Sequence, residues 1–319
     1  MTKPKLSFWQ IWNLSFGFLG VQIGYSLQNS NTSSIFESLG ADVSHLSYFW
    51  LAAPLAGMIV QPIVGLFSDG TWTRWGRRIP YILGGSLISA LALVLMPNCP
   101  KLLAFAPLAM GAFILLFMDL SFNVTMQPFR ALVADMLDDS QKTQGYVVQT
   151  FLINLGAVVG AILPLVMTWL GVSDEAAPGH VSPHIAYSYY AGGAILLLTV
   201  LITSFKTREY PPGEFARYNN LSEEDAKPVS FVGLMRNVPG VMVRLGVTQF
   251  FSWAALFLMW TYLKPAITGV VTDHATGEVL SAGATQTWVG VLNGTYPIPA
   301  CIAALFRLAS THSCSIDRK

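Results

Sequence analysis

The chain has 319 residues, of which 53% are hydrophobic and only 11% are charged, and its mean hydropathy is +0.52. Soluble domains of this size carry about a quarter charged residues. The charged residues here lie between long apolar runs, and a helix needs about 20 apolar residues to cross a bilayer. The composition therefore disfavours a soluble domain and predicts an all-α integral membrane protein. The net charge of +1 points to no particular partner.

Eight apolar runs are long enough to be interpreted as transmembrane helices. The first resembles a signal peptide, but it is too long and lacks a small-residue cleavage site, so we expect it to be retained. Pro297 and Pro299 interrupt the last run, which is the weakest of the eight. The predicted helices cover residues 8–29, 45–67, 79–96, 102–127, 146–170, 186–205, 241–263 and 288–306.

Lysine and arginine are distributed very unevenly between the two sides of this bundle. Of the 18 basic residues, only Lys101 and Lys264 fall in the loops of one side. Cytoplasmic loops retain basic residues during insertion, so the other side, with both termini, is predicted to be cytoplasmic. The short N-terminus, without a targeting segment, favours a multi-pass protein of a bacterial inner (plasma) membrane, with the lipid bilayer as its surroundings.

A long polar stretch divides the chain. Residues 206–240 contain Pro211, Pro212 and three adjacent acidic residues, and they are predicted to form a cytoplasmic central loop. Residues 1–205 then form an N-terminal six-helix half, and residues 241–319 form a partial C-terminal half that ends in a polar tail. Two halves built from inverted three-helix repeats, with a site at mid-membrane, are typical of secondary transporters.

Asp119 is the only carboxylate well inside a predicted helix. An ionised carboxylate there is costly unless it is paired or hydrated, which makes Asp119 a functional candidate. Arg130 follows eleven residues later, on nearly the same helix face but about 16 Å further along the axis. A kink at Pro128, another helix or the substrate is needed to connect the two. The alternatives are a structural hydrogen bond for Asp119 and a simple cytoplasmic anchor for Arg130.

Amide and aromatic side chains gather on several helices. Sugar hydroxyls need several donors and acceptors, and the C–H face of a pyranose packs on aromatic rings, so such a set suits a sugar. For any single residue, interhelical hydrogen bonding is an equally ordinary role. Gln249, Trp253 and Trp260 add amide and aromatic groups in the seventh helix. The candidate sugar-binding residues are Gln22, Tyr25, Gln28, Asn29, Asn123, Gln127, Gln149 and Asn154.

Catalytic and metal-binding patterns are missing from the sequence. The three cysteines and five histidines have no metal-ligand spacing, and no nucleophile stands with a base. We therefore predict a protein that is not an enzyme and has no metal, no cofactor and no nucleic-acid partner.

The loop after the second helix combines an acidic residue, a glycine and three arginines: Asp69, Arg74, Gly76, Arg77 and Arg78. An acidic residue at the end of one helix can pair with arginines at the start of the next. Such a latch can exist in only one of the two conformations between which the halves of a transporter rock. The alternative is topology, because three arginines in a short loop suffice to orient the chain.

This loop, together with Gly65, resembles the loop signature of the major facilitator superfamily. A longer set of matches resembles the plant-type sucrose/proton symporters and their bacterial relatives, in the glycoside/pentoside/hexuronide cation symporter group. These matches are Gly20-Val21-Gln22-Ile23-Gly24, Leu27-Gln28, Trp50-Leu51, Pro54, Gln61-Pro62, Val64-Gly65, Ser68-Asp69, Gly76-Arg77-Arg78, Ile82-Leu83, Asp119, Arg130-Ala131-Leu132 and Asp135.

In that family the fourth-helix aspartate is regarded as the proton-coupling group, with the arginine eleven positions on as its partner. The resemblance implies these roles for Asp119 and Arg130. The seventh helix departs from the family, because it reads Met259-Trp260-Thr261-Tyr262 where plant members have an acidic residue.

Symport of a sugar with a proton is accordingly the predicted function, and a disaccharide or α-glucoside such as sucrose or maltose is the predicted substrate. A sodium-coupled glycoside symporter is one alternative, although it would need carboxylates within the first two helices. We expect Glu37 and Asp42 in the external loop and Asp69 at the cytoplasmic end. A non-transporting sugar receptor or assembly subunit is the other alternative.

Overall fold

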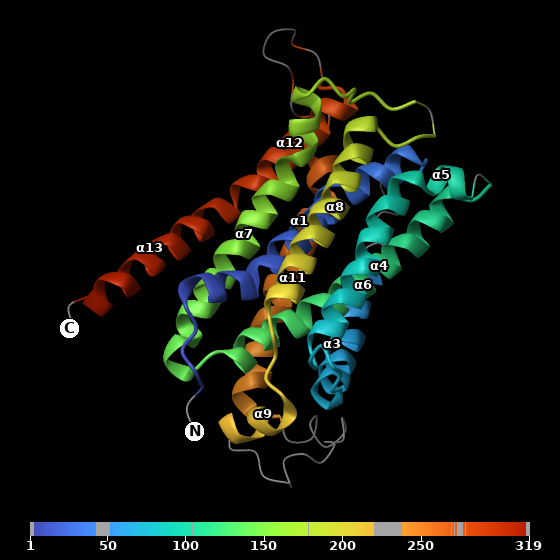
Figure 1. Ribbon diagram of the computed structural model, residues 1–319. Helices are drawn as coiled ribbons and strands as arrows, with labels where there is room; N and C mark the ends of the chain where they lie inside the picture. The colour runs from blue at the N-terminus through green and yellow to red at the C-terminus, as the bar shows by residue number, and fades with distance from the viewer. Residues whose placement is uncertain are drawn as a thin grey trace.

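The computed structural model shows an elongated bundle of helices (Figure 1). It describes residues 3–42, 52–103, 105–177, 179–219, 238–268, 270, 272, 277 and 279–316. Within these residues there is no β-sheet, only two isolated bridges. The prediction of an all-α protein is confirmed.

The long helices run between the two ends of the bundle, and successive ones mostly run in opposite directions (Figure 1). We call these the α9 end, where the N-terminus and α9 lie, and the α5 end, where α5 and α12 lie (Figure 1). The helices are α1 (Phe8–Ser38), α3 (Ala52–Gly70), α4 (Ile79–Leu95), η2 (Met96–Asn98), α5 (Cys99–Leu102), α6 (Pro107–Met136), α7 (Asp139–Trp169), α8 (Pro183–Lys206), α9 (Pro212–Tyr218), α11 (Gly240–Ile267), α12 (Ala282–Thr295) and α13 (Pro297–Ile316).

Local sequence explains where several helices begin. The Ser7 hydroxyl accepts from the Gln10 backbone amide, and the Gln10 side chain accepts from the Ser7 amide, so a capping box starts α1. Asp138 caps α7 through the Ser140 amide. Helices α4, α6 and α8 begin with proline in the first turn, where its missing N–H costs nothing.

The helices agree with the prediction in order and differ in extent. Six described segments are long and apolar enough to cross a membrane, so the predicted number of about eight is not confirmed. Helix α1 continues to Ser38, which puts Glu37 inside the helix and not in the following loop. The last predicted helix is divided at Tyr296 into α12 and α13. Residues 45–51 of the second predicted helix lie outside the described residues.

Helix α1 occupies a central position, since it packs against α7, α8 and α6, while α12 and α13 pack against α7. Small residues permit this close approach. A Cβ atom on Gly156 of α7 would lie 2.5 Å from the Leu19 carbonyl oxygen, and one on Gly160 would lie 2.5 Å from that of Ile23. This four-residue spacing lets the two backbones touch, as in other membrane bundles.

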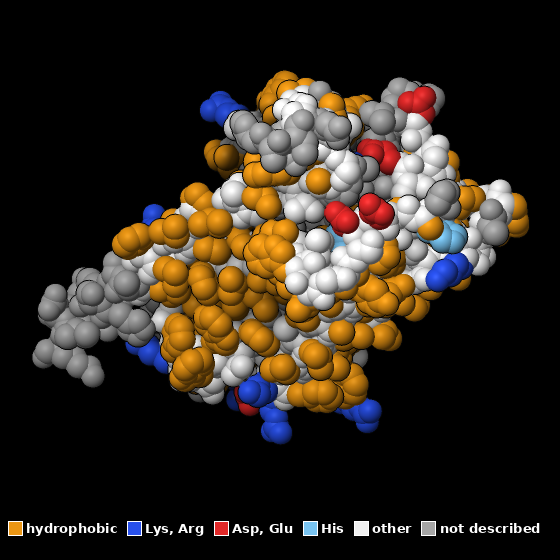
Figure 2. Space-filling model, turned by 90° about the horizontal axis from the view of Figure 1, so that it is seen from above, with side chains coloured by type: hydrophobic (Ala, Val, Ile, Leu, Met, Phe, Trp, Pro, Cys, Tyr) orange, Lys and Arg blue, Asp and Glu red, His pale blue; other side chains and the backbone are white. Residues whose placement is uncertain are grey.

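The sides of the bundle are apolar. Leu87 and Leu91 of α4 and Leu198 and Phe205 of α8 are among the large hydrophobic side chains that are more than half exposed. Figure 2, which looks down on the α5 end, shows hydrophobic side chains over much of the surface and only scattered charged ones. In water such a surface would be unfavourable, whereas in a bilayer it faces acyl chains.

Candidate functional site

A buried carboxylate lies in the middle of α6. The Asp119 side chain is 1% exposed, and its Oδ1 accepts a hydrogen bond from Nε2 of Gln28 on α1, which is itself fully buried. These two residues are far apart in the sequence, and the contact between α1 and α6 brings them together. A carboxylate in this position depends on its few polar neighbours for stabilisation.

The Asp119–Gln28 pair is only partly satisfied. Asp119 Oδ2 and Gln28 Oε1 are buried and have no hydrogen-bond partner among the described residues. Two acceptor oxygens therefore remain open beside a single donated hydrogen bond. A proton on Asp119 would turn one of these acceptors into a donor and would remove the charge.

Around this pair the polar side chains of α1, α3 and α6 interlock. Asn123 donates to the Asp119 backbone carbonyl oxygen at 2.8 Å, and its Oδ1 accepts from Gln61 of α3 at 2.6 Å. On α1 the Tyr25 ring meets the Phe122 ring edge-on, and Asn29 lies one turn further along the same helix. Amides and an aromatic face thus lie on the helices that hold Asp119.

Other predicted sugar-binding residues have different surroundings. Gln149 is buried and donates to the Phe129 carbonyl oxygen, which joins α7 to α6. Asn154 donates to the Thr150 carbonyl oxygen in its own helix. Gln22 and Gln127 are half-buried and make no hydrogen bond among the described residues. The polar groups around Asp119 are therefore only a subset of the predicted set.

Arg130 is exposed, in contrast to Asp119 on the same helix. Within the described part of the chain it forms no ion pair, including none with Asp119. Helix α6 continues without a break through Pro128, so the axial separation expected from the sequence is kept. Any coupling between the two side chains therefore needs a third group.

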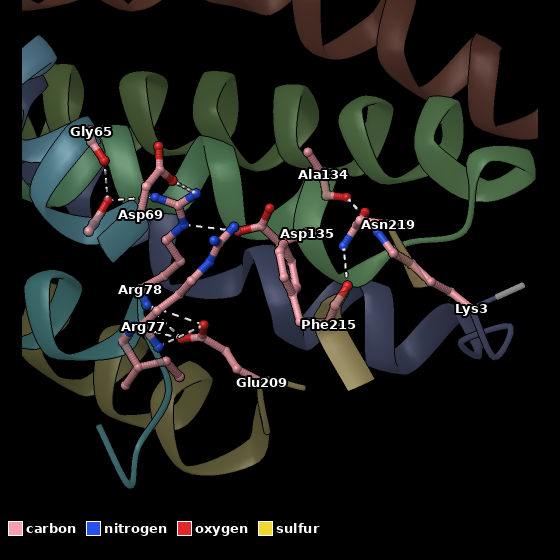
Figure 3. Close-up of polar contacts among 12 residues, drawn as sticks. Lys3, Gly65, Asp69, Arg77, Arg78, Ala134, Asp135, Glu209, Phe215 and Asn219 are labelled. Carbon is pink, nitrogen blue, oxygen red and sulfur yellow. Dashed lines mark hydrogen bonds and ion pairs between the residues drawn. The ribbon is translucent and has the colours of Figure 1, made fainter. Parts of the chain in front are cut away.

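A second set of charged residues lies at the α9 end (Figure 3). Arg77 and Arg78, which open α4, both pair with Oδ2 of Asp135 near the end of α6, at 2.7 and 2.9 Å. Arg78 also pairs with Asp69 at the end of α3 and donates to the Ser68 hydroxyl. One loop is thereby tied to two helix ends.

Glu209, just after α8, completes this cluster by capping α4. Its carboxylate accepts from the backbone amides of Arg77 at 3.0 Å, Arg78 at 2.9 Å and Ile79 at 2.9 Å. These amides have no partner inside the helix and carry the positive end of its dipole. Burial raises the pKa of Glu209, and the three amide bonds oppose that shift.

Gly76 makes room for this cap. Its φ of 110° is a conformation that side chains disfavour, and a Cβ there would lie 2.5 Å from the Glu209 carboxylate. The Arg77 guanidinium stacks 4.0 Å from the Phe215 ring centroid of α9. Arg74 is exposed and lies over Trp75, so this arginine is not part of the cluster.

Sequence reasoning missed Glu209 and gave no role to Asp135. One signal was present in the sequence: Arg78 precedes Pro80 at a predicted helix start, and an arginine side chain has no acceptor atom to cap a helix. The free amides of α4 required an acceptor from elsewhere. The choice of Glu209, more than a hundred residues away, depends on how α8 returns to the same end.

An apolar helical bundle of this kind, with a buried carboxylate and charged loops at one end, is a multi-pass membrane protein. The model of the family described as MFS/sugar transport protein matches residues 35–287. The chain belongs to this family, as the sequence motifs predicted.

Curated relatives carry the names of sugar transporters. Sucrose transport protein SUT1 of Oryza sativa subsp. japonica is 27% identical over 267 residues, 75% of this chain and 49% of the rice protein. The general alpha-glucoside permease of Schizosaccharomyces pombe is 25% identical over 283 residues, 82% of this chain and 48% of the yeast protein. Sucrose transport protein SUC4 of Arabidopsis thaliana is 27% identical over 259 residues, covering 75% and 50%. The chain thus spans about half the length of the curated relatives that it matches.

Proposed function

We propose that the protein takes part in symport of a sugar with a proton across a cell membrane. The observation that supports this best is the Asp119 carboxylate, buried in α6 with one donor and one open oxygen. The relatives named above are sucrose and alpha-glucoside transporters, which supports a disaccharide or α-glucoside as the substrate.

The chemistry of Asp119 favours a proton as the coupling ion. An ionised carboxylate in a low-dielectric interior is stabilised, among the described residues, by the Gln28 amide alone, whereas the protonated form needs no counter-charge. Protonation from outside, sugar binding, rocking of the two halves and release inside would then form the cycle. We assign Arg130 as the partner of Asp119 in this cycle, acting through the substrate or another helix.

The sugar would bind beside this carboxylate. Gln28 of α1 bonds the Asp119 side chain, and Asn123 of α6 bonds its backbone carbonyl oxygen. Tyr25 of α1 adds an aromatic face against Phe122, and Asn29 adds an amide one turn beyond Tyr25. Sugar hydroxyls can replace the present hydrogen-bond partners of these amides at little cost, because hydroxyls and amides each donate and accept hydrogen bonds. Gln22, Gln127, Gln149 and Asn154 would have secondary roles.

The orientation and domain division follow from charge. We place the α9 end, with the N-terminus and the Arg77–Arg78 cluster, in the cytoplasm, because basic residues mark the cytoplasmic side. Residues 1–205 are the first half, 206–240 the central loop and 241–319 part of the second half, in a plasma membrane. The cluster around Asp69, Arg77 and Arg78 then acts as a latch at the cytoplasmic end. Gly76 supplies the turn that its loop needs, and Arg74 contributes to the positive charge that keeps this loop in the cytoplasm.

The test is the external pH of weakly buffered cells producing the chain, on addition of maltose or sucrose. Alkalinisation is expected with the parent chain and should be lost with Asp119→Asn. Glu175→Gln, which neutralises an exposed loop carboxylate, is the matched control and should behave like the parent. Sugar uptake without alkalinisation in the parent would contradict proton coupling, and membrane-inserted protein without uptake would contradict transport by this chain.

A further inference from the structure

Helices α1 and α11 are joined at the α5 end by a buried ion pair. The Lys264 ammonium of α11 pairs with Oε2 of Glu37 and donates to the Ser34 hydroxyl at 2.9 Å. The two charged side chains are only 7% and 23% exposed. Lys264 is one of the two basic residues that the sequence places on this side.

Helix α12 adds further polar contacts at the same end of α1. Gln286 donates to the Ser30 carbonyl oxygen at 2.7 Å and to Oδ1 of Asn31 at 2.9 Å, and Asn293 donates to the Ser30 hydroxyl at 3.3 Å. All four side chains are buried. We call these contacts the polar seam, made of Ser30, Asn31, Ser34, Glu37, Lys264, Gln286 and Asn293.

The other end of α11 is different. Residues 240–255 are all exposed, and burial on this helix is limited to Thr261 and Lys264. Helix α11 thus meets α1 only near the α5 end, which holds the polar seam. Helix α11 is therefore joined to α1 at one end only, whereas α13 packs along α7.

A polar seam suits an interface that must open to water. Its groups are hydrogen-bonded to one another when closed and would be hydrated when open, so neither state leaves them without partners. The buried ion pair also favours the closed conformation, because separating the two residues leaves each charge uncompensated. Two acceptors, Glu37 Oε1 and Gln286 Oε1, are buried without a partner among the described residues, so the closed state is not fully stabilised.

We propose that the polar seam is the external gate of this transporter, with the Glu37–Lys264 ion pair as its lock. Sugar reaches the Asp119 region from outside only after this pair separates. The assignment rests on the proposed function and orientation, which place the α5 end outside. The lock differs from the Arg77–Arg78 cluster because it joins segments on opposite sides of the central loop.

A cysteine at the inner end of the gate tests this without any sugar flux. Ser30→Cys lies seven residues before Glu37, about 10 Å deeper along α1. In a background with the native cysteines replaced by serine, a membrane-impermeant maleimide added to intact cells should label this cysteine slowly. Adding Glu37→Gln or Lys264→Met should increase the labelling rate about tenfold or more, because each leaves a buried charge unpaired.

Lys101→Met is the matched control, because Lys101 is the other basic residue of this side and is exposed without an ion pair in the described chain. It should leave the rate unchanged. The charge exchange Glu37→Lys with Lys264→Glu should restore slow labelling, which a merely misfolded variant would not do. Unchanged labelling in both single variants, or an increase that the exchange does not reverse, would overturn the lock.

Orientation is checked separately by Glu175→Cys in the exposed loop between α7 and α8. Labelling of this cysteine in intact cells supports an external α5 end, and protection of it would overturn both the orientation and an external gate. A chain that shows no uptake but responds to the lock variants would contradict the proposed transport and still support the gate.

Discussion

Asp119 and Asp135 are carboxylates of the same helix, α6, with very different surroundings. Asp135, at the α9 end, pairs with two arginine side chains that are held in turn by Asp69 and by stacking on Phe215. Asp119, in the middle of the bundle, has one amide donor and one open oxygen among the residues that the structure describes. Asp135 is thus enclosed in a network of charges, whereas Asp119 has few polar contacts.

This difference separates the two kinds of polar site that a membrane bundle can hold. A network of fully paired charges holds its helices in one arrangement, and loss of one charged residue leaves its partners uncompensated. A sparsely paired carboxylate fixes little, but it can take up a proton with small rearrangement. We therefore expect substitutions in the Arg77–Arg78 cluster to affect stability first and substitutions around Asp119 to affect transport first.

The largest effect on stability is expected for Asp135→Ala. It leaves Arg77 and Arg78 without their shared carboxylate, and loss of one partner from a buried pair costs about 3–5 kcal/mol. Thermal unfolding of the purified protein in detergent would measure this loss. Asp139→Ala, which removes an ion pair whose acid is 91% exposed, should cost less than about 1 kcal/mol. Equal effects would show that the cluster is no more stabilising than a surface pair.

Gly76→Ala should have the next largest effect. A side chain at a φ of 110° strains the backbone by about 1–3 kcal/mol, and the added Cβ would also displace the Glu209 carboxylate from α4. The same thermal unfolding experiment applies. Gly70→Ala is the control, because nothing lies within 4 Å of a Cβ at that position. If Gly76→Ala were as stable as Gly70→Ala, Glu209 would not be a required cap.

Gln28→Ala addresses the sparsely paired site. Loss of the Gln28 donor to Asp119 should reduce sugar uptake about tenfold, in line with a hydrogen bond to a charged group, and should lower thermal stability less than Asp135→Ala does. Gln141→Ala removes a half-buried amide that bonds the Leu6 backbone, away from the proposed site, and should leave uptake nearly unchanged. Equal losses of uptake would mean that both amides are structural.

Much of the fold could be predicted from the sequence because a bilayer imposes strong constraints. Apolar runs located the long helices in the right order, but only the predicted helices 79–96, 186–205 and 241–263 have both ends within four residues of the structure. The extent of α1 was underestimated, because its last turns are rich in serine, threonine and asparagine and lack the apolar signal. Those residues are buried against α11 and α12, which is a tertiary contact that hydropathy does not reveal.

The candidate site was predictable only in part. Asp119 stood out because a carboxylate inside an apolar run is costly, and Arg77 and Arg78 stood out because three arginines crowd a short loop. Glu209, Gln61 and Lys264 gave no such signal, since each lies at a helix end or in an ordinary polar position. Their importance comes from the partners that packing brings to them, which sequence spacing does not give.

The smallest expected effect is a change in the pH dependence of stability. Burial raises the pKa of Glu209 above its ordinary value. Between the ordinary and the raised pKa, the folded protein holds a proton that the unfolded chain has released, so the free energy of unfolding falls as pH rises through this window. This slope cannot exceed about 1.4 kcal/mol per pH unit.

Glu209→Gln should remove that slope, which unfolding temperatures measured between about pH 4 and pH 7 would reveal. Glutamine keeps an acceptor oxygen for the α4 amides but has no proton to exchange. Glu214→Gln, an exposed neighbour in α9, is the control and should keep the parent slope. If Glu209→Gln also kept the slope, Glu209 would not be the group that binds the proton.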